Sequence, residues 1–237
     1  MNKMNILFLT VTKIENINCR GIYTDLLRYF VKEGHKIFVA SPTERRFGKD
    51  THLIEKNDHT ILQIKTLNIQ KTNFIEKGIG TILLAYQFRK SILKYYKDIH
   101  FDLILYSTPP ITFTQVIHDI KKRDNAKTYL LLKDIFPQNA VDLDLFSKKG
   151  LIHNYFRRKE KKLYKVSDVI GCMSPANVKF VLAHNREIDP KCVEVCPNSV
   201  ELETELPFVD TMKIRSKFAI PSKSVAFIYG GNLGKPQ

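Results

Sequence analysis

Cysteine and histidine are too few and too scattered to suggest a metal or redox centre. The four cysteines, Cys19, Cys172, Cys192 and Cys196, include no Cys-x-x-Cys pair, and the seven histidines form no His-x-x-x-His pair. We therefore expect reduced thiols in apolar strands or loops, as in a cytosolic protein. No residue is assigned to a metal.

Long hydrophobic runs are missing as well. The apolar run Ile6 to Leu9 has only the length of a strand, so we expect no secretory leader at the start. The most apolar helical pattern, residues 74–97, falls short of the roughly 18 continuous apolar residues that a bilayer-spanning helix needs. These absences favour a cytoplasmic location.

Glycine is scarce where a dinucleotide-binding protein requires it. The first expected strand is followed by a loop, residues 11–21, whose only glycine is Gly21. A nicotinamide or flavin site uses a tight Gly-x-Gly-x-x-Gly turn at this place, because the backbone must approach the pyrophosphate closely. The loop therefore argues against a dehydrogenase or an epimerase with such a cofactor.

Positive charge, in contrast, is abundant. The 237 residues carry a net charge of +14 within an ordinary composition of 43% hydrophobic and 26% charged residues. Nucleic acids, anionic lipids and nucleotide diphosphates are all partners that suit such a balance. No DNA-recognition helix or RNA-binding signature accompanies the charge, which disfavours nucleic acid.

Short apolar runs alternate with helical patterns along most of the chain. The runs are continuous, as in parallel strands covered on both faces. After the first run, Ile22, Leu26 and Tyr29 follow helical spacing, and Gly34 supplies a left-handed stop. The alternation predicts an α/β fold with a doubly wound, mainly parallel, Rossmann-like sheet that binds ligands at the carboxyl ends of its strands. The expected strands are 5–10, 37–40, 61–64, 102–106, 128–132, 168–172, 192–196 and 225–229.

An acidic and proline-containing stretch, Glu201 to Pro207, predicts a domain boundary. Residues 1–200 would form an N-terminal domain, and residues 201–237 a linker and the first elements of a second domain. In the second part, a helix over 209–218 and the strand 225–229 lead into a glycine-rich loop, whose backbone N–H groups could approach a phosphate. The candidate phosphate-binding residues are Gly230, Gly231, Asn232, Gly234 and Lys235.

Two loops bring polar groups to the expected carboxyl edge of the sheet. Lys133 and Asp134 directly follow an apolar strand, and charges there need partners, so we predict a substrate-binding or catalytic role. The alternative is that Asp134 caps a helix. Ser107 and Thr108 place two hydroxyl groups at another strand end, where they either bind a polar substrate or, for Thr108, cap the next helix.

Three further positions complete the candidate list. Arg20 and Gly21 precede an expected helix and could contact an anion, with an ordinary surface loop as the alternative. Ser174 lies in the loop after strand 168–172, which also ends at the predicted cleft. Asp142 and Asp144 form an Asp-x-Asp pattern, but within an amphipathic stretch and not after a strand, so we predict no metal site there.

Basic residues cluster on two expected helices. One helix contains the run 157–162, and the other, over 74–97, combines many aromatic and aliphatic residues with four cations. Such a mixture suits a helix that lies on an anionic membrane surface, the alternative being a solvated helix face. The candidate membrane contacts are Arg89, Lys90, Lys94 and Lys97.

Several of these segments together resemble one enzyme family. The start of the chain, with residues 23–27 (Tyr-Thr-Asp-Leu-Leu) and Gly34-His35, is similar to the start of family-four glycosyltransferases. Residues 195–201 resemble the Pro-Asn-Gly-Val-Asp segment that closes the N-terminal domain there, with Ser199 in place of the glycine. Residues 134–138 are similar to the Asp-x-Trp-Pro-Glu of a subgroup that builds capsule and O-antigen repeat units, and residues 231–235 look like the start of its donor domain.

The resemblance implies a GT-B fold of two facing Rossmann-like domains in a bacterial, metal-independent enzyme. It would transfer a hexosyl or N-acetylhexosaminyl group, with retention, from a UDP- or GDP-sugar to a polyprenyl-diphosphate-linked saccharide at the cytoplasmic face of the membrane. No cofactor is implied. In this scheme Asp134 and Lys133 are catalytic, and Arg20, Gly21, Ser107, Thr108 and Ser174 bind the acceptor.

Besides Ser199, the sequence departs from this family in further respects, one being that the loop after the first strand lacks the paired glycines. Many members have a histidine in the loop where this chain has Lys133 and Asp134, and the Glu-x7-Glu motif and the nucleoside contacts would lie beyond Gln237. We therefore expect the 237-residue chain to be inactive alone. The alternative function is a non-catalytic acceptor-binding or membrane-recruitment subunit that works with a separate donor-domain chain.

Overall fold

The computed structural model describes residues 3–69, 74–148, 150–202 and 210–231. The chain forms two compact units, residues 1–200 and residues 201–237.

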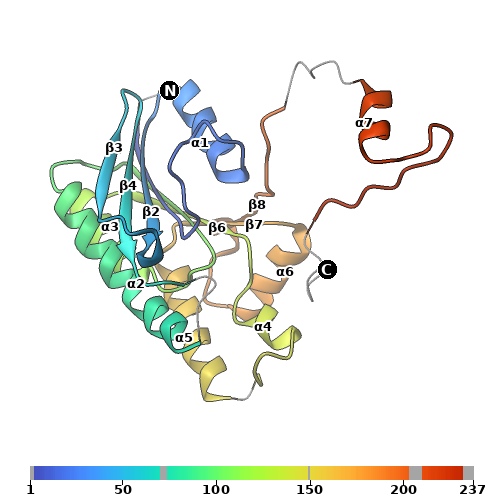
Figure 1. Cartoon of the computed structure of the whole chain (residues 1–237). Coiled ribbons are helices and arrows are strands. Elements are labelled where there is room, and N and C mark those ends of the chain that lie inside the picture. Colours follow the sequence, from blue (N-terminus) through green and yellow to red (C-terminus); the bar gives the residue numbers. More distant parts are fainter. Residues whose placement is uncertain (1–2, 70–73, 149, 203–209, 232–237) are drawn as a thin grey trace. The chain divides into compact units, whose positions relative to one another are not determined.

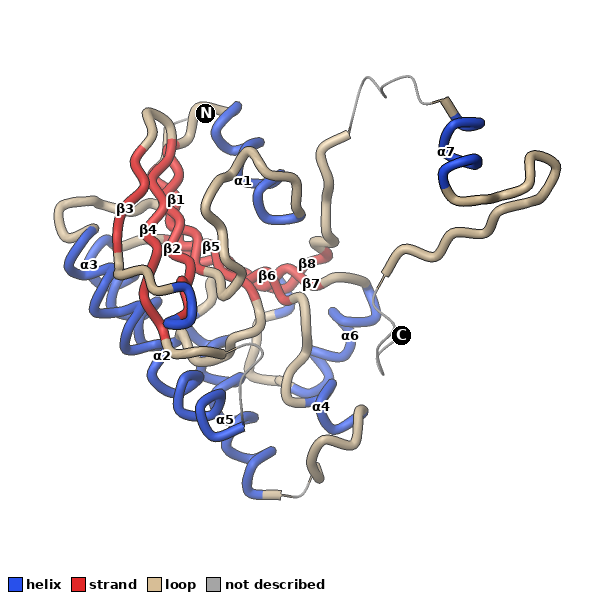
Figure 2. Tube along the Cα trace, in the orientation of Figure 1, coloured by secondary structure: helices blue, strands red, loops and turns tan. Residues whose placement is uncertain are grey.

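An eight-stranded sheet forms the centre of the first unit, in the order β3-β4-β2-β1-β5-β6-β7-β8 (Figure 2). Neighbouring strands are parallel except for β3 and β4, which are antiparallel. The predicted doubly wound, mainly parallel α/β fold is confirmed. The strands are β1 (Asn5–Leu9), β2 (Lys36–Glu44), β3 (His52–Glu55), β4 (His59–Thr66), β5 (Leu103–Ser107), β6 (Lys127–Leu132), β7 (Val169–Cys172) and β8 (Val193–Val195).

Helices cover both faces of this sheet. Buried residues of α2, α3, α5 and α6 belong to one apolar cluster, and those of α1 belong to the cluster on the other face (Figure 1). In the described part of the chain, no helix combines the length and the hydropathy that crossing a membrane requires. The helices are α1 (Ile22–Lys32), α2 (Phe74–Tyr95), α3 (Thr114–Asp124), α4 (Gln138–Asp142), α5 (Leu151–Val166) and α6 (Pro175–His184), with 3-10 turns at Arg45–Phe47 and Pro190–Cys192.

The two apolar clusters explain why the strands appear as continuous apolar runs. Along β1, Leu7 and Leu9 contribute to one cluster, whereas Ile6 and Phe8 contribute to the other. Successive side chains of a strand point to opposite faces, so a strand that is covered on both faces needs apolar residues at every position. Gly34 has a φ of +86° behind α1, as its expected role as a helix stop requires.

The prediction that strands and helices alternate strictly is wrong at one place. The residues from Ser41 to Glu44, expected in a loop, instead continue β2 and are buried. No helix separates β2 from β4; the antiparallel strand β3 lies between them in sequence and forms the edge of the sheet. An edge strand that is only partly buried needs no continuous apolar run, so the sequence gives little sign of it.

The second unit contains helix α7 (Thr211–Lys217) in its described part, inside the predicted range 209–218. The Asp210 carboxylate accepts from the backbone N–H groups of Met212 and Lys213 and so caps the helix. The prediction of a strand at 225–229 is wrong, because those residues are irregular and Phe227 is 94% exposed. A β-strand needs a hydrogen-bonded neighbour, and the described residues of this unit form no other strand.

Candidate functional site

The loops after β5 and β6 are joined through the hydroxyl of Thr108. Its Oγ1 accepts from the backbone N–H groups of Lys133, at 3.1 Å, and Asp134, at 3.3 Å, and donates to the Asp134 carbonyl oxygen at 3.2 Å. Thr108 is only 2% exposed. Its hydroxyl therefore holds the main chain that carries Lys133 and Asp134, and does not cap α3, which begins at Thr114 behind Phe113.

Lys133 and Asp134 lie half-buried at the carboxyl edge of the sheet. Burial lowers the pKa of the Lys133 amine, an effect partly opposed by the nearby Cys196, and burial raises the pKa of the Asp134 carboxyl. Within the described residues, no side chain or N–H group donates to the Asp134 carboxylate. Asp134 caps no helix either, since α4 begins at Gln138 with Pro137 as its N-cap.

Tyr23 joins these two loops from the first turn of α1. Its hydroxyl lies near the Ser107 side chain and near the Asp134 carboxylate. Burial raises the pKa of Tyr23, the nearby Ser107 side chain lowers it in part, and the Asp134 carboxylate raises it. The side chains of Tyr23, Ser107 and Asp134 thus meet at the ends of three parallel strands, where a doubly wound sheet binds ligands.

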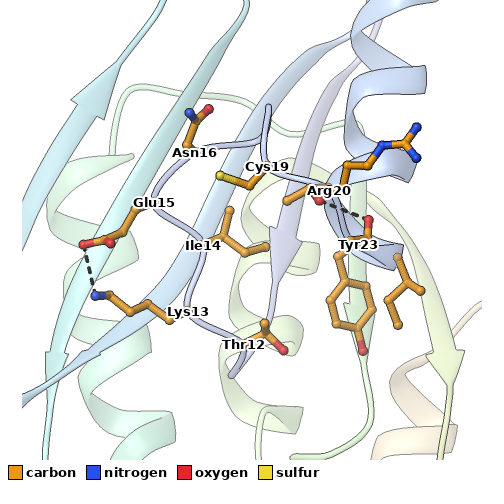
Figure 3. A pocket seen from close by; sticks show the side chains of 11 residues that line it. Thr12, Lys13, Ile14, Glu15, Asn16, Cys19, Arg20 and Tyr23 are labelled. Carbon is orange, nitrogen blue, oxygen red and sulfur yellow. Dashed lines mark hydrogen bonds and ion pairs between the residues drawn. The ribbon is translucent and has the colours of Figure 1, made fainter. Parts of the chain in front are cut away.

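A pocket of about 590 Å³ opens between the β1–α1 loop and the start of α1. Its lining comes from residues 12–16 and 19–24 and includes Arg20, Gly21 and Tyr23. Figure 3 shows the ion pair of Lys13 with Glu15, 3.1 Å long, on one side of the pocket and Arg20 on the other. The predicted residues Arg20 and Gly21 therefore line the same pocket as the site residue Tyr23.

The remaining predicted substrate-binding residues differ in their surroundings. Ser107 is 2% exposed and contacts Tyr23. Ser174 is the N-cap of α6, where its Oγ accepts from the Asn177 backbone N–H at 3.2 Å and donates to the Asn177 side-chain oxygen at 2.6 Å. In the expected phosphate loop, Gly230 and Gly231 lie in the second unit, and Asn232, Gly234 and Lys235 lie outside the described residues.

The four candidate membrane contacts lie on or next to the C-terminal half of α2. All four are exposed. The Arg89 guanidinium is paired with Asp119 of α3, and Lys97 lies 3.7 Å from Asp98. The Lys94 amine lies over the ring of Tyr95, 5.1 Å from its centre.

No metal site is formed by the side chains that the structure describes, since they bring no three His, Cys, Asp or Glu residues together. Asp142 and Asp144 lie in and just after α4, and Asp142 accepts from Gln138 at 2.7 Å.

The site residue that the sequence does not predict is Tyr23. Its position at the start of an amphipathic helix suggests only helix packing, and its partners come from loops about 85 and 110 residues further along the chain, which become neighbours only in the folded sheet. A tyrosine in the first turn after β1, at the ligand-binding edge of a doubly wound sheet, is the one signal that could have pointed to it.

No protein-family model matches the sequence, and no curated protein matches it. Solved structures do resemble the fold. A trehalose-6-phosphate synthase shares 10% identity with it over 91% of this chain and 55% of that chain, with a TM-score of 0.56. For a glycosyltransferase from Rickettsia africae the identity is 16%, the coverage 94% and 51%, and the TM-score 0.51. An Anabaena protein, HepE, in complex with UDP and glucose, shares 11% identity with it over 91% of this chain and 50% of that chain, with a TM-score of 0.52.

These likenesses establish the fold. The chain is a doubly wound, Rossmann-like α/β protein, as the sequence predicts, and it shares this fold with the three proteins. At such low identity the likeness concerns the fold alone, because one fold carries many activities. The chain spans about half the length of each of these three proteins.

Proposed function

We propose that this chain is the acceptor-binding half of a glycosyltransferase. The observation that carries the proposal is the meeting of Tyr23, Ser107 and Asp134 at the carboxyl edge of the sheet, beside the pocket that Arg20 and Gly21 line. The donor would be a UDP- or GDP-sugar. The acceptor would be a polyprenyl-diphosphate-linked saccharide in bacterial surface polysaccharide biosynthesis, used at the cytoplasmic face of the membrane.

The chemistry of the site suits a sugar hydroxyl as the incoming group. In the transfer, the acceptor oxygen forms a bond to the anomeric carbon while the bond from that carbon to the diphosphate oxygen breaks. The nucleoside diphosphate leaves with the electron pair, and the acceptor hydroxyl loses its proton. Asp134 is the candidate base, because its carboxylate has a raised pKa and accepts no hydrogen bond from the described residues.

Lys133 and the hydroxyl groups have the supporting roles in this proposal. The Lys133 ammonium would attract the negative charge of a diphosphate, and the hydroxyls of Tyr23 and Ser107 would orient the acceptor. Thr108 is a positioning residue, because its hydroxyl binds the main chain of Lys133 and Asp134. The proposed transfer of a hexosyl or N-acetylhexosaminyl group needs no metal or cofactor; the nucleotide sugar is a co-substrate.

A second chain segment is needed in this proposal to hold the nucleotide. We propose that residues 1–200 bind the acceptor, that Gly230 and Gly231 begin the donor phosphate loop, and that the 237-residue chain alone transfers no sugar. Under the alternative function, the chain recruits the acceptor for a separate donor-domain chain. A gene whose reading frame continues beyond codon 237 into a donor domain would exclude that alternative.

The test is sugar transfer by the full-length gene product, with a panel of UDP- and GDP-sugars and a polyprenyl-diphosphate-linked acceptor. Asp134→Asn should lower kcat by about 100-fold or more, the usual scale for loss of a general base. Asp144→Asn is the matched control, because Asp144 is exposed just after α4 and its φ of +56° suits asparagine equally well. Absence of turnover with every donor would refute the proposed function, and an unchanged rate in Asp134→Asn would remove Asp134 from the site.

A further inference from the structure

Exposed apolar side chains lie in the N-terminal parts of α2 and α5, on the outer face of each helix. On α2, Ile82 is 69% exposed, and on α5, Leu151 is 89% exposed. The spacing of the exposed residues follows one helical stripe in each helix. We call these residues the apolar band: Ile79, Ile82 and Tyr86 of α2, and Leu151, Ile152 and Tyr155 of α5.

The apolar band lies at the same edge of the sheet as the candidate site. Each of the two helices leaves the carboxyl end of one parallel strand and returns to the amino end of the next, so each helix begins at the carboxyl edge. Both helices pack on the same face of the sheet, with α3 between them. In Figure 1, where the colours follow the sequence, the earlier end of each of these two helices points toward the lower part of the picture.

Exposed cations follow the apolar residues toward the C-terminal ends of α2 and α5. On the described residues, no ion pair joins any of these cations to an acid, and all are exposed. Along the helix axis, Lys90 lies roughly 6 Å beyond Tyr86, and Arg158 lies roughly 4.5 Å beyond Tyr155. We call these residues the basic band: Lys90 and Lys94 of α2, Lys122 of α3, and Arg158, Lys162 and Lys165 of α5.

The acidic residues of the three helices do not offset the basic band. In the described residues of α2, α3 and α5, each of the four acids is paired with an arginine: Glu76 with Arg45, Asp119 with Arg89, Asp124 with Arg123, and Glu160 with Arg157. The outer face of the helical layer is therefore strongly positive.

We propose that this face, formed by the apolar band and the basic band, docks on an anionic lipid bilayer. The apolar side chains would enter the boundary between headgroups and acyl chains, and the basic band would lie at the depth of the lipid phosphates. A second copy of the chain is a poorer occupant, because a two-fold contact would bring the same cations together. The face differs from the four residues expected from the sequence, since it adds residues of α3 and α5. It omits Arg89, which is paired with Asp119, and Lys97, which lies 3.7 Å from Asp98.

The apolar band lies toward the same edge of the sheet as Lys133 and Asp134, whereas Tyr23 and the pocket lie on the face that α1 covers. A lipid-linked acceptor held in the bilayer would therefore reach the pocket around this edge of the sheet. The proposal deepens the proposed function and rests on it for the nature of the acceptor. Lipid binding itself can be measured without any sugar transfer.

The experiment is co-sedimentation of the 237-residue chain with vesicles, in the absence of nucleotide sugar. One set contains phosphatidylcholine alone, and the other contains phosphatidylcholine with about one third phosphatidylglycerol, a share chosen to resemble an anionic leaflet. We expect binding to the anionic vesicles only. We also expect it to weaken as NaCl is raised from about 0.05 to 0.5 M, because salt screens the basic band.

Paired variants separate the two bands. Ile82→Ser with Leu151→Ser should lower the partition coefficient by about tenfold, since two large apolar groups no longer enter the bilayer. The control is Leu202→Ser, an equally drastic change at a residue that is 82% exposed in the second unit. Lys162→Glu with Lys165→Glu should abolish the preference for anionic vesicles, whereas Lys56→Glu with Lys127→Glu, at exposed positions beside the amino ends of β4 and β6, should retain it.

Three results would overturn the docking surface. These are equal sedimentation with both vesicle types, unchanged binding in the Ile82 and Leu151 double variant, and a dimer in analytical ultracentrifugation that the same double variant dissociates, which would assign the face to a second copy. A wild-type chain that binds anionic vesicles while the full-length product transfers no sugar would leave the surface intact and refute the proposed function.

Discussion

At the scale of single residues, the candidate site depends on two charged side chains that are only half-buried. Burial shifts both pKa values toward neutrality, upward for Asp134 and downward for Lys133. In the proposed transfer, each shift has a direct consequence for activity. Asp134 must be ionised to accept a proton, and Lys133 must be protonated to attract a diphosphate.

The first prediction concerns the pH profile of sugar transfer by the full-length product. Activity should fall on the acid side as pH drops through the raised pKa of Asp134, at a higher pH than an ordinary aspartate would give. It should fall on the alkaline side as pH rises through the lowered pKa of Lys133. Lys133→Arg should move the alkaline limb upward, because a guanidinium stays charged. A Lys133→Arg profile that matches the wild-type one would assign that limb to another group.

A second prediction concerns the close packing beneath the loop that carries Lys133. A Cβ atom added at Gly171 would lie 2.5 Å from the Tyr129 hydroxyl oxygen and 2.7 Å from the Cys196 Cβ. Gly171→Ala should therefore reduce the free energy of unfolding by about 1–3 kcal/mol, the usual cost of overpacking. Urea denaturation measures it. Gly230→Ala is the control, with no atom within 4 Å of the added Cβ, and an equal loss in both variants would contradict the packing argument.

At the scale of elements, the C-terminal helices of the first unit are held together by one arginine. The Arg157 guanidinium of α5 pairs with the buried Glu160 and donates to the His184 carbonyl oxygen, at 2.6 Å, and to the Asn185 side-chain oxygen, at 2.7 Å. Glu160 is 3% exposed and also accepts from the Tyr164 hydroxyl at 2.8 Å. Burial raises the pKa of Glu160, although Arg157 opposes the shift.

The third prediction follows from this contact. Arg157→Ala should reduce the free energy of unfolding by roughly 3 kcal/mol, because it leaves the buried Glu160 carboxylate without its cation. Adding Glu160→Gln should restore part of the loss, since the uncompensated charge is removed. Arg158→Ala changes an exposed neighbour on the same helix and should cost at most about 0.5 kcal/mol. If the two alanine variants have the same stability, Arg157 does not hold α5 to α6.

Most elements of the first unit could be predicted from the sequence because both faces of the sheet are covered. Strands such as β1 and β6 then become continuous apolar runs, and Gly34 marks the end of α1. The hairpin of β3 and β4 could not be predicted in the same way, since β3 is a partly buried edge strand. The apolar run 225–229 predicts a strand wrongly, because an apolar run alone says nothing about whether a partner strand is present.

The candidate site was predictable as a set of loops but not as a set of contacts. Lys133, Asp134, Ser107 and Thr108 are the polar residues that directly follow apolar strands, and doubly wound sheets bind ligands there. The role of each of these residues depends on its distances to the other residues in the folded protein. Only the fold reveals that Thr108 binds the main chain of the next loop and that Tyr23 reaches Ser107.

At the scale of the whole molecule, the net charge of +14 includes cations that can act on a phosphate-rich partner. The basic band covers the outer face of α2, α3 and α5, and Lys133 lies at the carboxyl edge of the same sheet. In our account the two groups of cations serve one acceptor, the first through its membrane and the second through its diphosphate. We propose that residues 1–200 bind that acceptor.

The most direct test of the claim is photocrosslinking of the 237-residue chain with a photoreactive polyprenyl-diphosphate-linked saccharide in anionic vesicles, followed by peptide mapping. We predict labelled peptides from residues 12–24, 107–110 and 133–137, and competition by the unmodified lipid-linked saccharide. Tyr23→Ala should reduce the labelling several-fold, whereas Tyr229→Ala in the second unit should not. Labelling confined to other peptides, or labelling that the unmodified compound does not displace, would contradict the account.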